Sequence, residues 1–305
     1  MVPGAGSLLE PESGPMRLFR AAGMERLAWS LRRLHVPVRS DALVLDVGSG
    51  GNPYPRANVL LDAYEDTIER DHAPLVKDRP LVFGLMERLP FKNQAFDFVI
   101  ASHVLEHTHD PAAFLSELMR VGKAGYIETP DAFFERINPF RFHRLEVTDV
   151  DGRLVIFKKP SWRHATDVVD MYERKLKDPQ FIKFATEHPA PFHTRFYWEG
   201  SIPYVVQNPE VDAAWPLPQN TQEDLTGKRS LRARIRSYLV RAIRFAFSQN
   251  SRNRSLDLFS ILRCPGCGAD PIIEKNPTTL YCNNCGAEYP MLRGNPVMFT
   301  SGRHT

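Results

Sequence analysis

Cysteine is scarce in this sequence. The 305 residues contain four, and all of them lie within residues 264–285, so a disulfide framework spread along the chain is excluded. Long apolar runs are also missing: no stretch of about 18 residues is apolar throughout, and the Gly- and Pro-rich residues 1–15 lack the apolar core of a signal peptide. These absences predict a cytoplasmic protein.

Positive charge is concentrated in one segment. The net charge is +3, yet residues 228–254 contain nine Lys or Arg and no acid, so the rest of the chain is mildly acidic. Apolar residues recur at four-residue spacing within 231–247, which predicts a basic amphipathic helix. Such a helix could be a linker packed on the main domain, could lie on an anionic membrane at its inner surface, or could contact nucleic acid.

The middle of the chain has the pattern of a parallel sheet. Short apolar runs that end in turn residues occupy 43–47, 58–61, 81–83, 96–101 and 125–128. Helices are expected over 16–35 and 111–121, and a hairpin over 145–157. Residues 48–57 are too few for a full crossover helix. The fold class is therefore α/β, doubly wound and mostly parallel.

A glycine-rich bend follows the first expected strand. Residues 44–50 read VLDVGSG, where missing side chains let backbone N–H groups approach a ligand. Asp62 directly follows the second strand, where doubly wound folds place an acid that binds ribose; a helix cap is the alternative. A P-loop is excluded because its Lys is missing, and Asn52-Pro53 disfavours a dinucleotide fold.

Residues 103–107 read HVLEH, which fits a signature of certain zinc peptidases. That interpretation requires a long helix, which Asp110-Pro111 would end within a turn. Directly after a strand, the string instead faces the carboxyl edge of the sheet, where ligands bind in open α/β folds. His103 would then touch the ligand; a structural role for His103, Glu106 and His107 is the alternative.

Taken in order, these segments resemble the motifs of class I S-adenosylmethionine-dependent methyltransferases of type 11: LDVGSG at 45–50, Asp62, ERLPF at 87–91, FDFVI at 96–100 and HVLEH at 103–107. The resemblance spans about residues 40–130 and implies a Rossmann-like sheet. It implies that Asp46, Gly48, Ser49 and Gly50 contact the methionine part of the cofactor, Asp62 its ribose, Met86 and Glu87 its adenine, and that His103 lies against it. Leu85 departs from the family, because many members carry an Asp there that bonds the adenine amine. The proline-stiffened loop 51–55 also departs from it by replacing the usual first helix.

The expected reaction is methyl transfer to a small-molecule or glycan acceptor, at a hydroxyl. The sulfonium donor carries its own leaving group, so alignment matters more than a strong acid or a metal. A base would help to remove the hydroxyl proton, and the candidates are His103, which is favoured, His107, His143 and His193. An RNA or protein methyltransferase, or an inactive methyltransferase fold that serves as a binding scaffold, are the alternatives.

The four cysteines form two Cys-x-x-Cys pairs, Cys264 with Cys267 and Cys282 with Cys285, each followed by a glycine. This spacing predicts two knuckles that present four thiolates to one structural zinc; a redox or disulfide pair is the alternative. The segment also resembles the small zinc-ribbon proteins that activate methyltransferases, which implies a fused ribbon that docks on the catalytic domain or on a protein partner.

The expected domain organisation follows from these patterns. Residues 1–15 are expected to be disordered, 16–220 to form the methyltransferase domain (core 40–130, substrate-side insertion 131–220), 225–262 a basic helical linker, and 263–305 the zinc ribbon.

Overall fold

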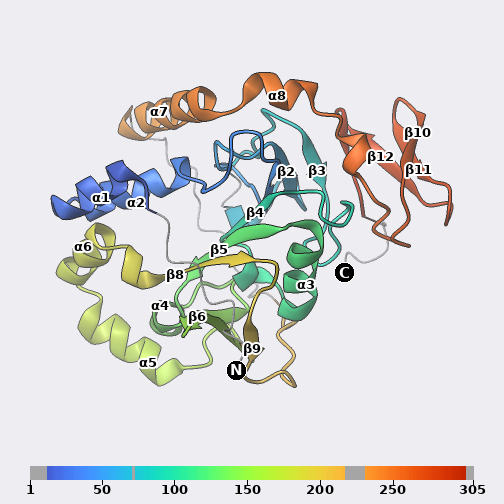
Figure 1. The fold of residues 1–305 in the computed structure, drawn as a ribbon. Helices are drawn as coiled ribbons and strands as arrows, with labels where there is room; N and C mark the ends of the chain where they lie inside the picture. Colours follow the sequence, from blue (N-terminus) through green and yellow to red (C-terminus); the bar gives the residue numbers. More distant parts are fainter. Residues whose placement is uncertain (1–11, 71–72, 217–230, 300–305) are drawn as a thin grey trace, which may run out of the picture. The chain divides into compact units, whose positions relative to one another are not determined.

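The computed structural model describes residues 12–70, 73–216 and 231–299 (Figure 1). The chain divides into two compact units. The first comprises Met1–Val38, Ala101–Ala112 and Ala124–Thr221, and the second Arg39–Ile100, Ala113–Lys123 and Gln222–Thr305. Within the described ranges, no helix has both the length and the apolar character needed to cross a bilayer.

A six-stranded sheet has the order β3-β2-β1-β4-β5-β8. Its strands are β1 (Val44–Val47), β2 (Val59–Asp62), β3 (Leu81–Phe83), β4 (Phe98–Ser102), β5 (Ala124–Pro130) and β8 (His193–Glu199). Strands β1, β2 and β3 pair in parallel, whereas β5 and β8 pair antiparallel. Every residue of β1, β2 and β3 is buried, as in a sheet covered on both faces. The predicted doubly wound, mostly parallel α/β fold is confirmed.

In the second unit, the connections agree with the short spacing seen in the sequence. No helix lies between β1 and β2, as expected from Pro53 and Pro55. Helix α3 (Pro111–Val121) begins at a proline, and Phe114, Leu115 and Leu118 on its inner face are fully buried. The predicted crossover helix is therefore confirmed.

Two further helices of this unit follow the undescribed residues 217–230, a range that includes the start of the expected linker. Helix α7 (Leu231–Phe247) has the predicted bounds, and α8 (Asn250–Ser255) was not expected. Leu239, Ile243 and Phe247 are exposed, so this part of the apolar stripe does not pack on the unit.

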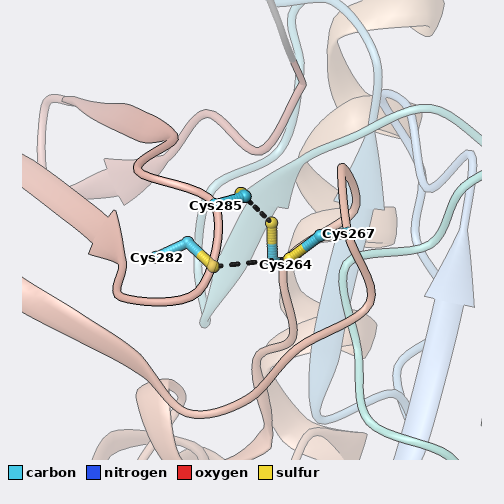
Figure 2. Close-up of side chains that lie close together, drawn as sticks. All are labelled: Cys264, Cys267, Cys282 and Cys285. Atoms are coloured by element: carbon cyan, nitrogen blue, oxygen red, sulfur yellow. Dashed lines mark hydrogen bonds between the residues drawn. The ribbon is translucent and has the colours of Figure 1, made fainter.

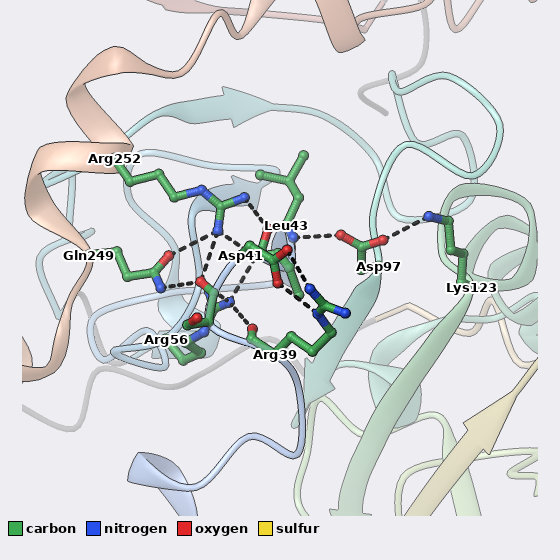
Figure 3. Close-up of polar contacts among 10 residues, drawn as sticks. Arg39, Asp41, Leu43, Arg56, Asp97, Lys123, Gln249 and Arg252 are labelled. Atoms are coloured by element: carbon green, nitrogen blue, oxygen red, sulfur yellow. Dashed lines mark hydrogen bonds and ion pairs between the residues drawn. The ribbon is translucent and has the colours of Figure 1, made fainter.

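Helix α8 is tied to the segment that leads into β1 (Figure 3). Arg252 donates to the carbonyl oxygens of Asp41 (2.6 Å) and Ala42 (2.7 Å), and Gln249 donates to that of Ser40 (2.6 Å). Asn253 is buried and accepts from Asn58 at 2.8 Å. These bonds tie Arg252, one of the arginines of the basic segment, to the unit itself.

The C-terminal module, residues 262–299, is a four-stranded antiparallel sheet of β10 (Ile272–Asn276), β11 (Thr279–Cys282), β12 (Glu288–Leu292) and β13 (Asn295–Pro296). It shares backbone hydrogen bonds with the edge of the six-stranded sheet: Met298 N donates to Phe83 O (2.7 Å) and Arg263 N to Pro90 O (3.0 Å). Residues 83–90 are thus held near both ends by the module.

The first unit begins with two helices in place of the one expected over 16–35. Helix α1 (Gly14–Ala21) and helix α2 (Glu25–Leu31) are separated at Gly23, whose φ of +72° interrupts the helix. A short 3-10 turn, η1 (Arg32–Leu34), follows. The prediction of disorder over 1–15 is wrong at Gly14 and Pro15, which start α1, and residues 1–11 lie outside the described residues.

The segment after residue 130 adds a second, three-stranded sheet to the first unit. Strands β6 (Leu145–Val150) and β7 (Arg153–Lys158) form the predicted hairpin, and Asp151 and Gly152 both have positive φ in its turn. Strand β9 (Tyr204–Val206) pairs in parallel with β7. Helices α4 (Ala132–Ile137), α5 (Thr166–Met171) and α6 (Pro179–Glu187) complete this unit.

A buried ion pair joins η1 to β5 inside the first unit. Glu128 is fully buried and accepts from Arg32 Nε at 2.7 Å and Arg32 Nη2 at 2.6 Å.

Replacing Arg32 by Met would leave a buried carboxylate with fewer donors, so we expect Arg32→Met to lower the free energy of unfolding by about 3 kcal/mol. Urea unfolding followed by circular dichroism measures this. Arg39→Met, at the exposed Arg39–Asp41 pair, is the control and should leave the transition unchanged; equal stability of both variants would contradict the expectation.

Candidate functional site

In the second unit, the carboxylates at the ends of β1 and β2 both bind the glycine-rich bend. Asp62 Oδ2 accepts from Gly50 N at 3.0 Å, and Asp46 Oδ2 accepts from Tyr54 N at 2.8 Å. Both acids are buried. The two side chains therefore converge on one loop, residues 48–54, and they fix its backbone.

The bend itself has the features of a ligand cradle. Gly48 and Gly50 have φ of +64° and +56°, a region that disfavours side chains. A Cβ on Gly51 would lie 3.1 Å from Pro74 O. Ser49 is buried, and its Oγ has no hydrogen-bond partner among the described residues. Since a buried hydroxyl normally finds a partner, the bend fits a polar ligand group at Ser49.

Arg70 and Tyr64 are neighbours of Asp62 that the sequence did not reveal. Asp62 Oδ1 accepts from Arg70 Nη1 at 2.9 Å and from Tyr64 N at 3.2 Å. Arg70 Cδ lies 3.2 Å from the position of a Cβ on Gly50. The guanidinium thus covers part of the carboxylate that the resemblance assigns to ribose, and no motif in the sequence marks it.

The predicted adenine-side residues follow β3 in the same unit. Gly84 N donates to Asp62 O at 3.0 Å, which places the start of this segment beside the end of β2. Leu85, Met86 and Glu87 are half-buried. Desolvation raises the pKa of Tyr64, and the charges of Glu69, Glu87 and Asp62 raise it further, so Glu87 and Asp62 act on one phenol. Contact of Met86 and Glu87 with adenine stays a prediction.

In the first unit, His103 lies between two buried carboxylates. Its Nδ1 is 3.3 Å from Glu106 Oε1 and its Nε2 is 3.3 Å from Glu128 Oε1. Its φ is +59°, an uncommon conformation for a residue other than glycine, and its amide donates to Glu128 O at 2.7 Å. Strained backbone of this kind is concentrated at functional sites.

The charges around His103 set its protonation. Desolvation disfavours the imidazolium, but hydrogen bonds and charges from Glu106 and Glu128 outweigh it and raise the pKa of His103 to about 10. Desolvation likewise disfavours the Glu128 carboxylate, yet Arg32 and His103 hold its pKa well below the usual range. His103 is therefore a cation near neutral pH, suited to holding negative charge rather than to accepting a proton.

The other predicted histidines lie in two pairs. The rings of His103 and His193 have centroids 5.5 Å apart, and those of His107 and His143 are 4.8 Å apart, both edge to face. The 3-10 turn η3 (Leu105–His107) contains Glu106 and His107. No α-helix carries HVLEH, so the helical arrangement of a zinc peptidase is absent from this part of the described chain.

The four cysteines converge in the C-terminal module (Figure 2). Cys264 Sγ is 3.7 Å from Cys285 Sγ, and Cys267 Sγ is 3.6 Å from Cys282 Sγ. Four sulfurs about 2.3 Å from a tetrahedral zinc would be ~3.8 Å apart, whereas a disulfide needs about 2 Å. The thiols are therefore spaced for a metal, and the distances do not fit a disulfide.

The two Cys-x-x-Cys knuckles, at 264–268 and 282–286, have the same backbone hydrogen bond and the same glycine conformation. Gly268 N donates to Cys264 O and Gly286 N to Cys282 O, both at 2.9 Å, and each glycine has a φ of +75°. A Cβ on Gly268 would come within 2.5 Å of Arg263. Tyr289, fully buried, places its hydroxyl 3.0 Å from Cys264 Sγ. A hydrogen bond to a ligating sulfur is a common outer contact of metal sites.

Comparisons with solved structures give weak likenesses. An S-adenosylmethionine-dependent methyltransferase of Thermotoga maritima is 19% identical over 38% of this chain and 56% of its own, with a TM-score of 0.28. A chain from a complex of the Haloferax volcanii Trm112 methyltransferase activator with a methyltransferase is 18% identical, over 43% of this chain and 76% of its own length, with a TM-score of 0.28. A Listeria monocytogenes S-adenosylmethionine-dependent methyltransferase is 11% identical, over 59% of this chain and 97% of its own length, with a TM-score of 0.33.

The matched part spans little more than half of the Thermotoga protein, and no curated protein matches the chain. A family model gives the firmer assignment: residues 45–127 match the one described as a methyltransferase domain. These residues include β1 to β4, the glycine-rich bend, Asp62 and HVLEH. Residues 45–127 of this chain are therefore similar to a methyltransferase domain, over less than half of the 305 residues.

Proposed function

We propose that the chain transfers a methyl group from S-adenosylmethionine to a hydroxyl of a small-molecule or glycan acceptor. One observation carries the cofactor part: the bend of residues 48–54, held by Asp46 and Asp62, contains a buried Ser49 hydroxyl that has no partner among the described residues. The family match over 45–127 supports the reaction class.

The roles of the residues follow from their positions. Ser49 and the backbone at Gly48 and Gly50 would hold the methionine part, and Asp62 would accept hydrogen bonds from the ribose hydroxyls. S-Adenosylmethionine supplies an activated methyl group when bound. Because Arg70 and Gly50 already donate to Asp62, the ribose would share this carboxylate with them or displace Arg70 from it.

The acceptor is proposed from the residues beyond the core. Residues 143–198 are rich in aromatic and histidine side chains, which suit stacking on a sugar or an aromatic ring. The base role of His103 stays a prediction, and its raised pKa supports charge stabilisation beside Glu106 and Glu128 instead.

An anionic membrane surface or nucleic acid remains a proposed partner of α7, supported by its arginines and by exposed Tyr238 and Phe245.

Binding of S-adenosylhomocysteine tests the cofactor site. We expect the wild-type protein to bind it in a calorimeter, and Asp62→Ala to weaken binding by about 1 to 3 kcal/mol, because polar bonds to the ligand are lost and the Gly50 amide is released.

Asp97 provides the matched control for this experiment. It too accepts a hydrogen bond from a backbone amide, that of Leu43 at 2.8 Å (Figure 3). Asp97 precedes β4, however, whereas Asp62 ends β2. Asp97→Ala should bind as the wild type does. If the folded wild type binds no S-adenosylhomocysteine, the proposed function is wrong; if Asp62→Ala binds with unchanged affinity, Asp62 is not part of the site.

We also propose that the C-terminal module is a zinc ribbon that buttresses the methyltransferase domain. The sulfur spacing supports the metal, and the backbone bonds at Phe83 and Pro90 support the docking. With four thiolates as ligands the coordination shell is full, so the zinc is structural. A separate protein partner for the ribbon stays a prediction.

Replacing Cys282 and Cys285 by Ser should unfold the module and release about one zinc per chain, because so small a module folds poorly without metal. Elemental analysis measures the zinc. We expect the same variant to bind S-adenosylhomocysteine more weakly, since residues 83–90 lose their support. Full zinc content in the double variant would refute the assignment of the ligands.

Tyr289→Phe isolates the contact outside the ligands. Losing the hydroxyl beside Cys264 should weaken zinc binding by roughly 10- to 100-fold in competition with a chelator. Tyr281→Phe, on the neighbouring strand β11, is the control and should retain wild-type affinity. If the two variants release zinc at the same chelator concentration, the Tyr289 hydroxyl does not stabilise the site.

A further inference from the structure

A second group of metal-ligand side chains lies in the first unit, whereas the cysteines belong to the second. Glu106, His107 and His143 each offer one ligand atom, and these atoms lie within 4.8 Å of one another. Glu106 and His143 are buried, and His107 is half-buried. The three residues come from two segments, η3 and the turn after α4, which a backbone hydrogen bond from Arg144 N to Glu106 O (2.7 Å) holds together.

Glu106 is the first indication that the group binds an ion. Its side chain is 1% exposed, its Oε1 contacts the imidazole of His103, and its Oε2 accepts no hydrogen bond from any described residue. The nearest imidazole nitrogens are His103 Nδ1 at 3.3 Å and His143 Nε2 at 3.9 Å from Oε1. His103 compensates this carboxylate on the side of Oε1, but leaving the buried Oε2 without a partner is costly unless another positive group completes its surroundings.

The orientation of His143 is the second indication. Its Nδ1 lies 2.7 Å from Glu135 Oε2, and the other oxygen of Glu135 accepts from the fully buried Lys159 at 2.7 Å. If Nδ1 carries the proton toward Glu135, Nε2 has a free lone pair on the side of Glu106. A carboxylate behind a histidine in this way is the usual outer shell of a metal-ligating imidazole.

From this geometry we propose that Glu106, His107 and His143 bind a divalent first-row transition metal ion. Two imidazoles with one carboxylate suit zinc, cobalt, iron or manganese better than magnesium or calcium, which take oxygen ligands. Ligand atoms about 2.1 Å from one ion are roughly 3.0–3.4 Å apart, so modest side-chain rotations close the site.

This site differs from the cysteine site in one chemical respect. Three protein ligands leave at least one coordination position for water or for an oxygen of a ligand, whereas four thiolates fill a tetrahedral shell. HVLEH contributes Glu106 and His107 as ligands here, and neighbouring His103 is an ion-pair partner of Glu106. The proposal does not depend on methyl transfer.

Cobalt(II) is the probe for the test, because its absorption distinguishes the two sites: thiolate ligands give intense charge-transfer bands, and imidazole and carboxylate ligands do not. The protein is first given one equivalent of zinc per chain, which the four thiolates bind ahead of a site with three protein ligands. Titration with cobalt(II), followed by calorimetry and absorption, should show one further ion per chain without thiolate bands.

His143→Ala and Glu106→Gln should each weaken this binding at least tenfold, and Glu106→Gln keeps the side-chain shape in case the first variant folds poorly. His188→Ala is the matched control, because His188 also contacts a carboxylate, Glu25 at 2.7 Å, but lies outside the group. It should bind cobalt as the wild type does. S-Adenosylhomocysteine binding is measured on the same samples, so failure of the proposed function is scored separately.

Either of two results overturns the proposal. Wild-type protein that holds one zinc per chain at the cysteines binds no cobalt, or folded Glu106→Gln and His143→Ala bind it as tightly as His188→Ala does. Glu106 and His143 would then be members of the side-chain network around Glu135 and would bind no metal.

Discussion

The candidate cofactor site depends on two buried carboxylates, Asp46 and Asp62, that accept hydrogen bonds from backbone amides of one loop. The bonds from Gly50 to Asp62 and from Tyr54 to Asp46 help to hold residues 48–54 in a bend that has positive φ at two glycines. The prolines of this loop replace the rigidity that a crossover helix normally gives. The same acids that would bind a ligand therefore also shape the surface that receives it.

The first unit uses charge differently. From Lys159 through Glu135, His143, Glu106 and His103 to Glu128, acids and bases alternate through its interior. Each carboxylate lies between two nitrogen groups, so a change at one member alters the electrostatic balance of its neighbours. Residues far apart in the sequence are coupled in this way, which a motif of five residues cannot express.

Features with a local signature could be predicted from the sequence. The strands, the hairpin at Asp151-Gly152, helix α7 and the paired cysteines all depend on spacing within a few residues, and the structure has them. The break at Gly23 was missed because one glycine inside a helical pattern is often tolerated. Arg70 on Asp62 and His143 beside Glu106 could not be found, because loop conformation and tertiary packing bring these partners together and no periodic pattern precedes them.

Strand β3 lies at the edge of the six-stranded sheet, and an unprotected edge presents amide and carbonyl groups to any other extended chain. In this protein the residues after β13 occupy part of that edge, with Val297 bridged to Phe83 and Met298 fully buried. The cysteine module therefore covers part of the edge strand β3. A chain that lost the fold of this module would expose a strand able to recruit other copies, so self-association would accompany its loss.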